Sequence, residues 1–357
     1  MTGISPGAKV AVGMSGGVDS SVTAAVLKDR GFDVIGIMLR LWSEPGQINR
    51  CCTVDALSDA RYTAGQLGIP FYAVDAKDSF REVVVESFID GYQRGVTPNP
   101  CLMCNRWIRW GLMLDRARAF GADYLATGHY ARIRRREEKP SQLLKGVDPG
   151  KDQSYVLYML SQEQLSRTLL PLGEFTKHQV REMAHDYGLP AAERPDSQDL
   201  CFLGTGDYRD FLAQRAPEVV KPGPILSPAG ERLGEHPGLA FFTIGQRKGL
   251  GISPSQPHYV MDKIPERNAL VVAPREELGR DSFTAVRVNW ISGTPPARPI
   301  PAEVQIRYRS REVPGTVTPG PEAAVRVKLD RDLPDITPGQ AAVFYQDQIC
   351  LGGGIIQ

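Results

Sequence analysis

The first third of the sequence predicts an α/β domain built on a doubly wound parallel sheet. Short apolar runs that are typical of buried strands occupy residues 9–13, 33–39, 71–74 and 124–127. Segments with helical character follow them at 20–30, 57–67, 79–92 and 106–120. Strands that alternate with helices form parallel sheets, which bind ligands at the carboxyl ends of their strands. We therefore expect the functional site in the loops 14–19, 38–42 and 128–130.

The remainder of the chain has a different character. Residues 152–188 are predicted to be helical, and after about Asp207 many Pro and Gly residues separate short alternating runs such as 342–345. This pattern is typical of small β units. The Pro-rich stretch 294–301 is interpreted as a break or connection near a third domain. The predicted domains are a nucleotide-binding α/β domain, a small central β-rich domain and a C-terminal β-barrel-like domain, over residues 1–205, 206–278 and 279–357.

Composition limits the class of protein. A chain of 357 residues exceeds what one hydrophobic core usually serves, which agrees with several domains. The 42 basic and 41 acidic residues give a net charge of +1, so a surface for nucleic acid has to be local. The sequence has neither a run of about 20 apolar residues nor the layout of a signal peptide at residues 1–7. We expect a cytoplasmic protein that does not bind membranes.

The loop after the first strand carries the most information. It consists of Gly13, Met14, Ser15, Gly16, Gly17, Val18, Asp19 and Ser20. Gly16 and Gly17 lack a Cβ atom and allow close approach of a ligand, while the first amides of the next helix attract anions. The loop has neither the lysine of a P-loop nor the spacing of a dinucleotide fingerprint. It resembles the pyrophosphate loop of the ATP pyrophosphatases, although an ordinary tight turn is the alternative.

The cysteines form a second pattern. Cys101 and Cys104 make a C-x-x-C pair just before a helix predicted from Asn105, where the helix dipole lowers a thiol pKa. Cys201 lies about a hundred residues further on. Three chemistries compete for these thiols: a catalytic pair that closes a disulfide, an iron–sulfur site and structural zinc. Cys51 and Cys52 are interpreted as ordinary loop thiols, and Cys350 as a core residue.

These residues together support a family resemblance. Besides the glycine loop and Cys201, the blocks that carry it are 97–100, 104–105, 126–130, 151–155, 199–202, 243–251, 337–340 and 350–354. The chain resembles the tRNA-specific 2-thiouridylases, which replace the C2 oxygen of the wobble uridine by sulfur. The resemblance extends over nearly the whole length. It implies an adenine nucleotide alpha-hydrolase-like fold for the first domain.

The resemblance also implies roles for particular residues. ATP is expected on Gly13–Ser20 with Met38 and Gly128 near the adenosine, and Cys104 is the expected nucleophile with Cys201 as persulfide carrier. The residues expected to contact tRNA are Asn99, Pro100, Cys101, Lys151, Asp152, Gln153, Tyr308 and Arg309. Many family members have aspartate where this chain has Cys101. Its presence resembles members proposed to hold an iron–sulfur cluster, with Cys101, Cys104 and Cys201 as ligands to a 4Fe-4S centre.

The chemistry is consistent with these roles. The C2 oxygen of uridine is a poor leaving group, so adenylation from ATP has to precede sulfur transfer. Asp19 is interpreted either as a residue that helps to hold Mg²⁺ or as an ordinary acid at a helix N-terminus. A persulfide on Cys201 would supply sulfur, and Cys104 would then form a disulfide with it. The expected sulfur donor is a cysteine desulfurase or a sulfur-relay protein.

Local positive charge is the remaining signal for RNA. Arginines gather at 132–136, at 106 and 109, and at 307, 309 and 311, where strand alternation would place the last three on one face. A solvated charged surface is the alternative for each patch. His129 is interpreted either as an acid–base residue or as a structural histidine.

Two other functions stay open from the sequence. The first is an amide-forming synthetase that acts on a small carboxylate and has the same type of ATP loop. The second is a non-catalytic module that binds RNA or an iron–sulfur centre.

Overall fold

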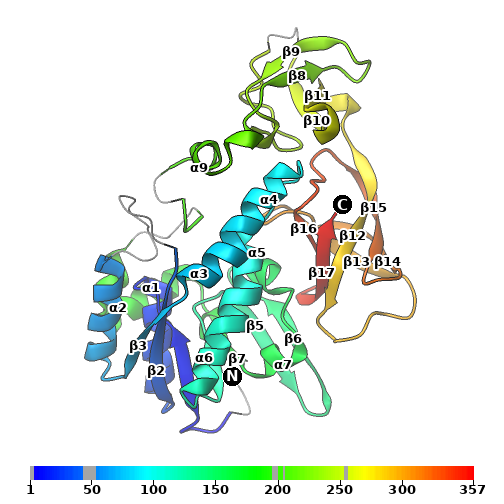
Figure 1. The fold of residues 1–357 in the computed structure, drawn as a ribbon. Coiled ribbons are helices and arrows are strands. Elements are labelled where there is room, and N and C mark those ends of the chain that lie inside the picture. The colour runs from blue at the N-terminus through cyan, green and yellow to red at the C-terminus, as the bar shows by residue number, and fades with distance from the viewer. Residues whose placement is uncertain (1–3, 43–53, 195–199, 204–205, 253–255) are drawn as a thin grey trace.

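A computed structural model describes residues 4–42, 54–194, 200–203, 206–252 and 256–357. Three β-sheets divide the chain into an N-terminal α/β part, a small β region around β8–β11 and a C-terminal barrel (Figure 1). The cysteines at 51 and 52, and Asp199 in the block around Cys201, lie outside the described residues.

The predicted parallel sheet is confirmed. Its strand order is β3-β2-β1-β4-β7, and every neighbouring pair is parallel. The strands are β1 (Lys9–Gly13), β2 (Asp33–Arg40), β3 (Phe71–Asp75), β4 (Tyr124–Ala126) and β7 (Thr168–Leu169). Val10, Ala11 and Val12 of the central strand are fully buried, which explains the uninterrupted apolar run in the sequence.

The helices of this part cover both faces of the sheet (Figure 1). They are α1 (Val18–Asp29), α2 (Val54–Gln66), the continuous segment α3 (Lys77–Phe80), η1 (Arg81–Glu86) and α4 (Ser87–Gln93), and the segment α5 (Pro100–Met103), η2 (Cys104–Met113) and α6 (Leu114–Ala119). The last segment begins at Pro100 rather than at the predicted Asn105. Asn99 caps it by accepting a hydrogen bond from the Cys101 amide at 3.1 Å, and Pro100 suits the first helical position. The η1 and η2 turns are π-helical, a form that is frequent at functional sites.

The prediction of continuous helix over residues 152–188 is wrong. This region contains η3 (Ser154–Leu157), α7 (Gln162–Ser166), β7, η4 (Pro171–Glu174) and α8 (Lys177–Asp186). Thr168 and Leu169 pair with Leu125 and Ala126 of β4 and thereby complete the parallel sheet. Tertiary pairing decides the conformation of this short apolar run, and Pro171 prevents helix from continuing through it.

The central region is a four-stranded sheet with the order β10-β11-β8-β9. Helix α9 (Tyr208–Arg215) precedes it, and its strands are β8 (Gly223–Leu226), β9 (Arg232–His236), β10 (His258–Ile264) and β11 (Ala269–Pro274). Ile225, Val260 and Leu270 form part of its own apolar core.

The C-terminal region is a closed barrel of six strands, because β12 pairs with both β15 and β17. Its strands are β12 (Arg280–Trp290), β13 (Ile300–Gln305), β14 (Val313–Pro319), β15 (Val325–Leu333), β16 (Ala341–Gln346) and β17 (Ile349–Ile356). The Pro-rich stretch 294–301 leads from β12 into β13, so it is a connection between two strands of the barrel. The expected strand alternation of Arg307, Arg309 and Arg311 is wrong, since β13 ends at Gln305 and Arg309 has a φ of 63°.

The N-terminal part and the barrel are joined through the backbone. The hairpin β5 (Ala131–Arg136) and β6 (Lys139–Lys145) extends the barrel sheet through pairing of β6 with β17. The Thr97 amide donates to the Pro338 carbonyl at 2.9 Å, and Gln340 Nε2 donates to the Thr97 carbonyl at 2.8 Å. The loop before α5 is therefore held by the barrel. Within the described residues, no helix has the length and apolar character required to cross a membrane.

Leu125→Ala tests the burial of β4 between β1 and β7 in the parallel sheet. Leu125 is fully buried, and we expect the substitution to lower the free energy of unfolding by about 2–5 kcal/mol because it leaves a cavity. Urea unfolding measures the loss. Leu233→Ala is the control, because Leu233 is 38% exposed and its truncation should cost less than about 0.5 kcal/mol. Equal losses of unfolding free energy in the two variants would contradict the buried position of Leu125 in β4.

Candidate functional site

The loop between β1 and α1 is shaped by close backbone packing. The Met14 amide donates to the Ile37 carbonyl of β2 at 2.8 Å, which holds the loop at the carboxyl edge of the sheet. Gly16 has a φ of +75°, and a Cβ atom there would lie 2.5 Å from the Ala56 carbonyl oxygen. Gly17 takes the N-cap position of α1 without a side-chain cap. Only glycine satisfies both the conformation and the space at position 16.

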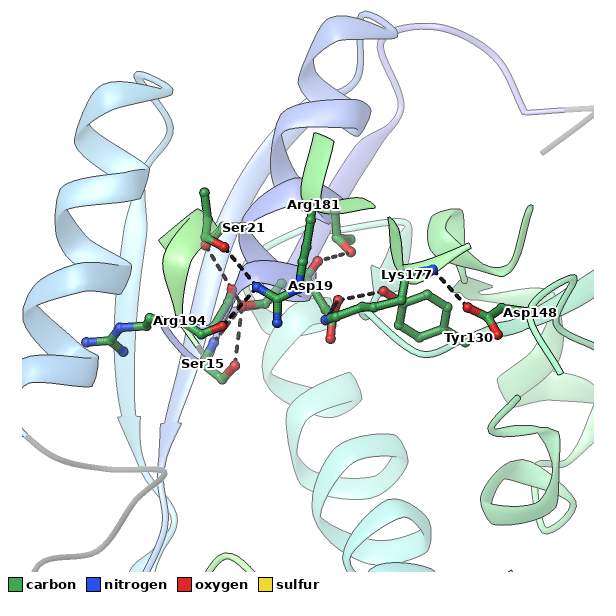
Figure 2. A network of polar contacts seen from close by, with 12 residues as sticks. Ser15, Asp19, Ser21, Tyr130, Asp148, Lys177, Arg181 and Arg194 are labelled. Atoms are coloured by element: carbon green, nitrogen blue, oxygen red, sulfur yellow. Dashed lines mark hydrogen bonds and ion pairs between the residues drawn. The ribbon is translucent and has the colours of Figure 1, made fainter. Parts of the chain in front are cut away.

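Hydroxyl groups brace this turn from within. Ser20 Oγ and Ser21 Oγ each donate to the Gly17 carbonyl at 3.0 Å. The Ser15 amide donates to Ser20 Oγ at 3.2 Å (Figure 2). The loop therefore holds its shape in the protein alone, with the first turn of α1 at its end. Glycine backbone and the N-terminal amides of a helix fit a polyphosphate, so these residues suit the pyrophosphate portion of ATP.

Asp19 lies in the first turn of α1 and is bound by two groups from distant segments. Its Oδ1 accepts a hydrogen bond from Tyr130 Oη at 2.7 Å and forms an ion pair with Lys177 Nζ at 2.7 Å (Figure 2). A Cβ atom at Gly128 would lie 2.9 Å from Asp19 Cβ, so Gly128 allows this close packing. The Asp19 carboxylate is the kind of oxygen ligand that Mg²⁺ takes, and in this structure Tyr130 and Lys177 bind it.

Two residues around the loop were missed by sequence reasoning. Lys177 comes from α8, and Arg194 donates from Nη1 to the Gly16 carbonyl at 3.3 Å while it forms an ion pair with Asp59. The sequence shows a Thr176-x-x-Gln179 capping box, which signals only the start of a helix. Separations of 158 and 178 residues from the partners leave no local signal that these cations reach the loop.

Met38 has a buried side chain in the core beside Met14 and Ala56. With 2% of its surface exposed, it can offer a nucleotide only its backbone. The expected role near adenosine therefore stays a prediction, as it does for Gly128.

The helix that carries Cys104 runs past the glycine loop. Cys101 is exposed and Cys104 is buried. A Cβ atom at Gly13 would lie 3.0 Å from the sulfur of Met113, which is the last residue of η2. Cys104 lies nine positions before Met113 in the same helical segment, which leads through α6 into β4. Because β4 is parallel to β1, the Cys104 end of this segment lies toward the carboxyl edge of the sheet.

Cys201 packs against the same apolar cluster that contains Cys104. The neighbouring Phe202 anchors this segment, because its ring makes edge contacts with Phe88 at 5.2 Å and Phe80 at 6.2 Å between centroids. Both aromatic partners come from the segment α3–α4. The structure therefore brings the segments of Cys104 and Cys201 to one core, although a hundred residues separate them.

The metal alternatives require three convergent ligands. The part of the chain that the structure describes contains no group of three His, Cys, Asp or Glu side chains arranged to hold a metal ion. Cys101 is exposed at the first turn of the helix while Cys104 is buried in the core. Cys101 and Cys104 lie one helical turn apart, and the 4Fe-4S centre expected on them and Cys201 stays a prediction.

The segment expected to contact tRNA at 151–153 has structural contacts as well. Asp152 Oδ1 accepts from the Gly146 amide at 2.8 Å, and burial raises the pKa of its carboxyl group. Gln153 Oε1 accepts from the Tyr130 amide at 3.0 Å, and its own amide donates to the Tyr130 carbonyl at 2.8 Å. Gln153 therefore positions Tyr130, whose hydroxyl reaches Asp19.

The barrel residues expected to contact tRNA are linked to the helix that carries Cys104 through the segment around Tyr155. The ring of Tyr308 lies 5.9 Å from that of Tyr155, and the Arg309 guanidinium lies 5.3 Å from the centre of the Tyr308 ring. Asn105 Nδ2, next to Cys104, donates to the Val156 carbonyl at 2.9 Å. The sequence block around Tyr155 thus connects the helix of Cys104 to Tyr308 and Arg309.

The arginine patch at β5 is largely occupied within the protein. Arg132 Nε donates to the Lys145 carbonyl at 2.8 Å, and Arg135 Nη2 donates to the Thr168 carbonyl at 2.7 Å. The structure favours a structural role for these two side chains.

His129 is a structural histidine in this fold. Its Nδ1 lies 2.8 Å from Thr127 Oγ1, and its ring lies 5.3 Å from that of Trp110. Burial, and secondarily the charge of Arg109, holds the pKa of His129 well below its usual range. The imidazole is therefore neutral at physiological pH.

Together the five-stranded parallel sheet, the glycine turn at its carboxyl edge and the attached barrel define a nucleotide-binding α/β protein. The family model described as "tRNA methyl transferase HUP domain" matches residues 8–205. The models "tRNA methyl transferase PRC-barrel domain" and "Aminomethyltransferase beta-barrel domain" match residues 209–274 and 280–356.

Curated relatives match nearly the full length of this chain. The tRNA-specific 2-thiouridylase MnmA of Moorella thermoacetica is 49% identical over 353 residues, which cover 97% of this chain and 98% of the relative. MnmA of Chloroflexus aggregans is 47% identical over 352 residues and covers 98% of each chain. A solved structure of the U34-tRNA thiolase NcsA from Methanococcus maripaludis is 21% identical, covers 59% of this chain and 67% of that chain, and has a TM-score of 0.37. The chain belongs to the tRNA-specific 2-thiouridylase family.

Gly16→Ala tests the fit of the loop to a nucleotide. We expect ATP binding, measured by calorimetry, to weaken at least tenfold, because the Cβ atom displaces the turn from Ala56. Gly31→Ala is a matched control, since Gly31 has a φ of +81° but open space around its Cβ position. It should cost about 1–2 kcal/mol of stability and leave ATP affinity unchanged. Equal ATP affinity in the two variants would contradict the close-packing argument.

Burial of neutral His129 predicts a pH dependence of stability. Its pKa is lower in the folded state than the 6.5 of the unfolded chain, so protons favour unfolding as the pH falls below 6.5. The contribution of this group should fall by about 1.4 kcal/mol per pH unit between pH 6 and 5. Urea unfolding of wild type and His129→Gln at pH 7, 6 and 5 measures the contribution of His129 to the free energy of unfolding. Parallel pH profiles in the two proteins would disprove a depressed pKa.

Proposed function

We propose that the protein, a transferase of the tRNA-specific 2-thiouridylase family, converts the wobble uridine of tRNA to 2-thiouridine in two steps, of which the first consumes ATP. The observation that supports this most directly is the position of the Cys104 helix, which packs against Gly13 through Met113 and whose Cys104 end lies toward the carboxyl edge of the sheet. Activation and sulfur transfer would then occur in one region of the molecule.

In the first step the C2 oxygen of uridine attacks the α-phosphorus of ATP. The bond from this phosphorus to the departing pyrophosphate breaks, and the proton of uridine N3 is released. Gly13–Ser20 and the first amides of α1 would bind the pyrophosphate as negative charge develops on it. Asp19 would help to hold the Mg²⁺ that neutralises part of this charge.

In the second step sulfur replaces the adenylated oxygen. The terminal sulfur of a persulfide on Cys201 would attack C2 and expel AMP with its oxygen. Cys104 would attack the Cys201 sulfur, so that the S–S bond of the persulfide breaks and its terminal sulfur stays on the uridine. The product is a disulfide between Cys104 and Cys201, which an external dithiol must reduce. The pair is supported by the packing of the Cys201 segment, through Phe202, on α3 and α4, in the same apolar cluster that contains Cys104.

The other regions would bind RNA and partners. In the proposed division, residues 1–205 activate and thiolate the base, 279–357 help to bind tRNA through Tyr308 and Arg309, and 206–278 link the two. Asn99, Pro100 and Cys101 would face the target base, and Lys151, Asp152 and Gln153 would approach the tRNA. A cysteine desulfurase or sulfur-relay protein would load Cys201. The reaction would take place in the cytoplasm, where its tRNA substrate resides.

The reaction itself is tested with protein, ATP, Mg²⁺, a sulfur source and unmodified tRNA. We expect release of pyrophosphate and AMP together with 2-thiouridine in the tRNA, detected by nucleoside analysis. If AMP and 2-thiouridine both fail to form, the proposal is wrong, and pyrophosphate release with a small carboxylate in place of tRNA would favour the amide-forming synthetase.

Cysteine variants test the sulfur route. Cys104→Ser and Cys201→Ser should lose 2-thiouridine formation while tRNA-dependent pyrophosphate release persists, because the first step needs neither thiol. Cys350→Ala is the control, since this thiol is fully buried in the barrel and burial raises its pKa. It should retain thiolation. Full activity of Cys104→Ser would refute the disulfide route.

The iron–sulfur alternative is tested by anaerobic purification of wild type and Cys101→Ala, followed by iron and sulfide analysis. We expect wild-type protein that is free of iron and still active. Iron that is bound by wild type and lost in Cys101→Ala would overturn the persulfide route.

A further inference from the structure

The proposed pyrophosphate site needs a cation that its own loop lacks. Gly13–Ser20 contains the acidic Asp19 and neither Lys nor Arg. Pyrophosphate carries several negative charges when it leaves ATP, and the N-terminus of α1 contributes only about half a positive charge. Asp19 repels this anion unless its own charge is balanced. A cation from another part of the chain is therefore required at the loop.

Lys177 is placed to supply this charge. Its Nζ lies 2.7 Å from Asp19 Oδ1 and 5.9 Å from the centre of the Tyr130 ring, and its side chain is only 11% exposed (Figure 2). Burial of a lysine is costly and requires a compensating partner. The ammonium group is thus held against Asp19 in the first turn of α1, the end of the helix whose backbone amides lack partners within the helix.

The backbone of Lys177 is held as firmly as its side chain. Thr176 and Gln179 form a capping box around the start of α8. The Lys177 amide donates to Asp148 Oδ2 at 2.9 Å. These contacts fix the root of the side chain, so its ammonium group can move between neighbouring oxygens without movement of the helix.

Arg194 is less suited to the same task. Its guanidinium group forms an ion pair with Asp59 of α2 and a hydrogen bond to the Gly16 carbonyl, so it stabilises the turn from outside. Lys177, in contrast, pairs with Asp19, the acid to which the proposed function assigns the Mg²⁺ of ATP.

We propose that Lys177 binds the leaving pyrophosphate of ATP and that its ion pair with Asp19 is the resting state of the site. When ATP binds, the ammonium group transfers from Asp19 to oxygens of the β- and γ-phosphates, and Asp19 becomes available to the metal ion. No group is oxidised or reduced, and Lys177 keeps its proton throughout. The idea rests on the proposed function for the identity of the nucleotide, but the binding of pyrophosphate by Lys177 can be measured alone.

Calorimetric titration of the protein with inorganic pyrophosphate in the presence of EDTA tests this binding without a metal ion and without ATP turnover. Lys177→Met should weaken pyrophosphate binding by about 10- to 100-fold, because a charge-assisted hydrogen bond is lost. Lys177→Arg should restore part of the affinity. In the presence of tRNA and MgATP, Lys177→Met should also slow pyrophosphate release by at least about 100-fold.

Lys145→Met is the matched control. Lys145 Nζ also forms a largely buried ion pair, at 2.6 Å from Glu312 Oε1, but this pair joins β6 to the barrel. Its loss should leave pyrophosphate affinity within twofold of wild type.

Asp19→Asn separates binding from a purely structural role. If Lys177 only restrains Asp19, adding Lys177→Met to Asp19→Asn has no further effect on pyrophosphate affinity, and the proposal fails. If Lys177 binds the anion, the double variant still loses about tenfold or more relative to Asp19→Asn. Absence of tRNA-dependent pyrophosphate release in wild type would refute the proposed function, whereas unchanged pyrophosphate affinity in Lys177→Met would refute the role of Lys177.

Discussion

The close packing of the Gly13–Ser20 turn against α2 is the constraint on which the site depends. Position 16 combines left-handed backbone geometry with a carbonyl oxygen of α2 at a distance that excludes any side chain. Hydroxyl groups of Ser20 and Ser21 bind the Gly17 carbonyl and thereby fix the start of α1. Because the backbone is already ordered, little conformational entropy is lost when an anion binds.

A second layer of contacts joins this turn to the rest of the molecule. Asp19 is bound by Tyr130, Tyr130 is held by Gln153, and the next residues of that segment contact the barrel through Tyr155, whose hydroxyl donates to the Ala341 carbonyl at 2.9 Å. The loop before the Cys104 helix is bound by Pro338 and Gln340. The Gly13–Ser20 turn, the helix that carries Cys104 and the barrel therefore form one connected structure, which suits the proposed two-step reaction.

Sequence reasoning was most successful where the signal is local. Four of the five strands of the parallel sheet follow from uninterrupted apolar runs, and the tight turn before α1 follows from its glycines and the helix after it. It failed where pairing partners are distant. Thr168 and Leu169 form a strand only because β4 offers a free edge, and Arg309 leaves the predicted strand because β13 ends in a turn.

The residues from 8 to 130 thus determined the parallel sheet and the place of the glycine turn at its carboxyl edge, because periodicity and turn propensity act over a few residues. Only the tertiary structure decided that Lys177 and Arg194 reach this turn and that the hairpin β5–β6 joins the barrel. It also decided that Cys104 and Cys201 share one apolar cluster. The physical reason is that these contacts depend on how packed elements meet in space, and the sequence near each residue carries no record of its partner.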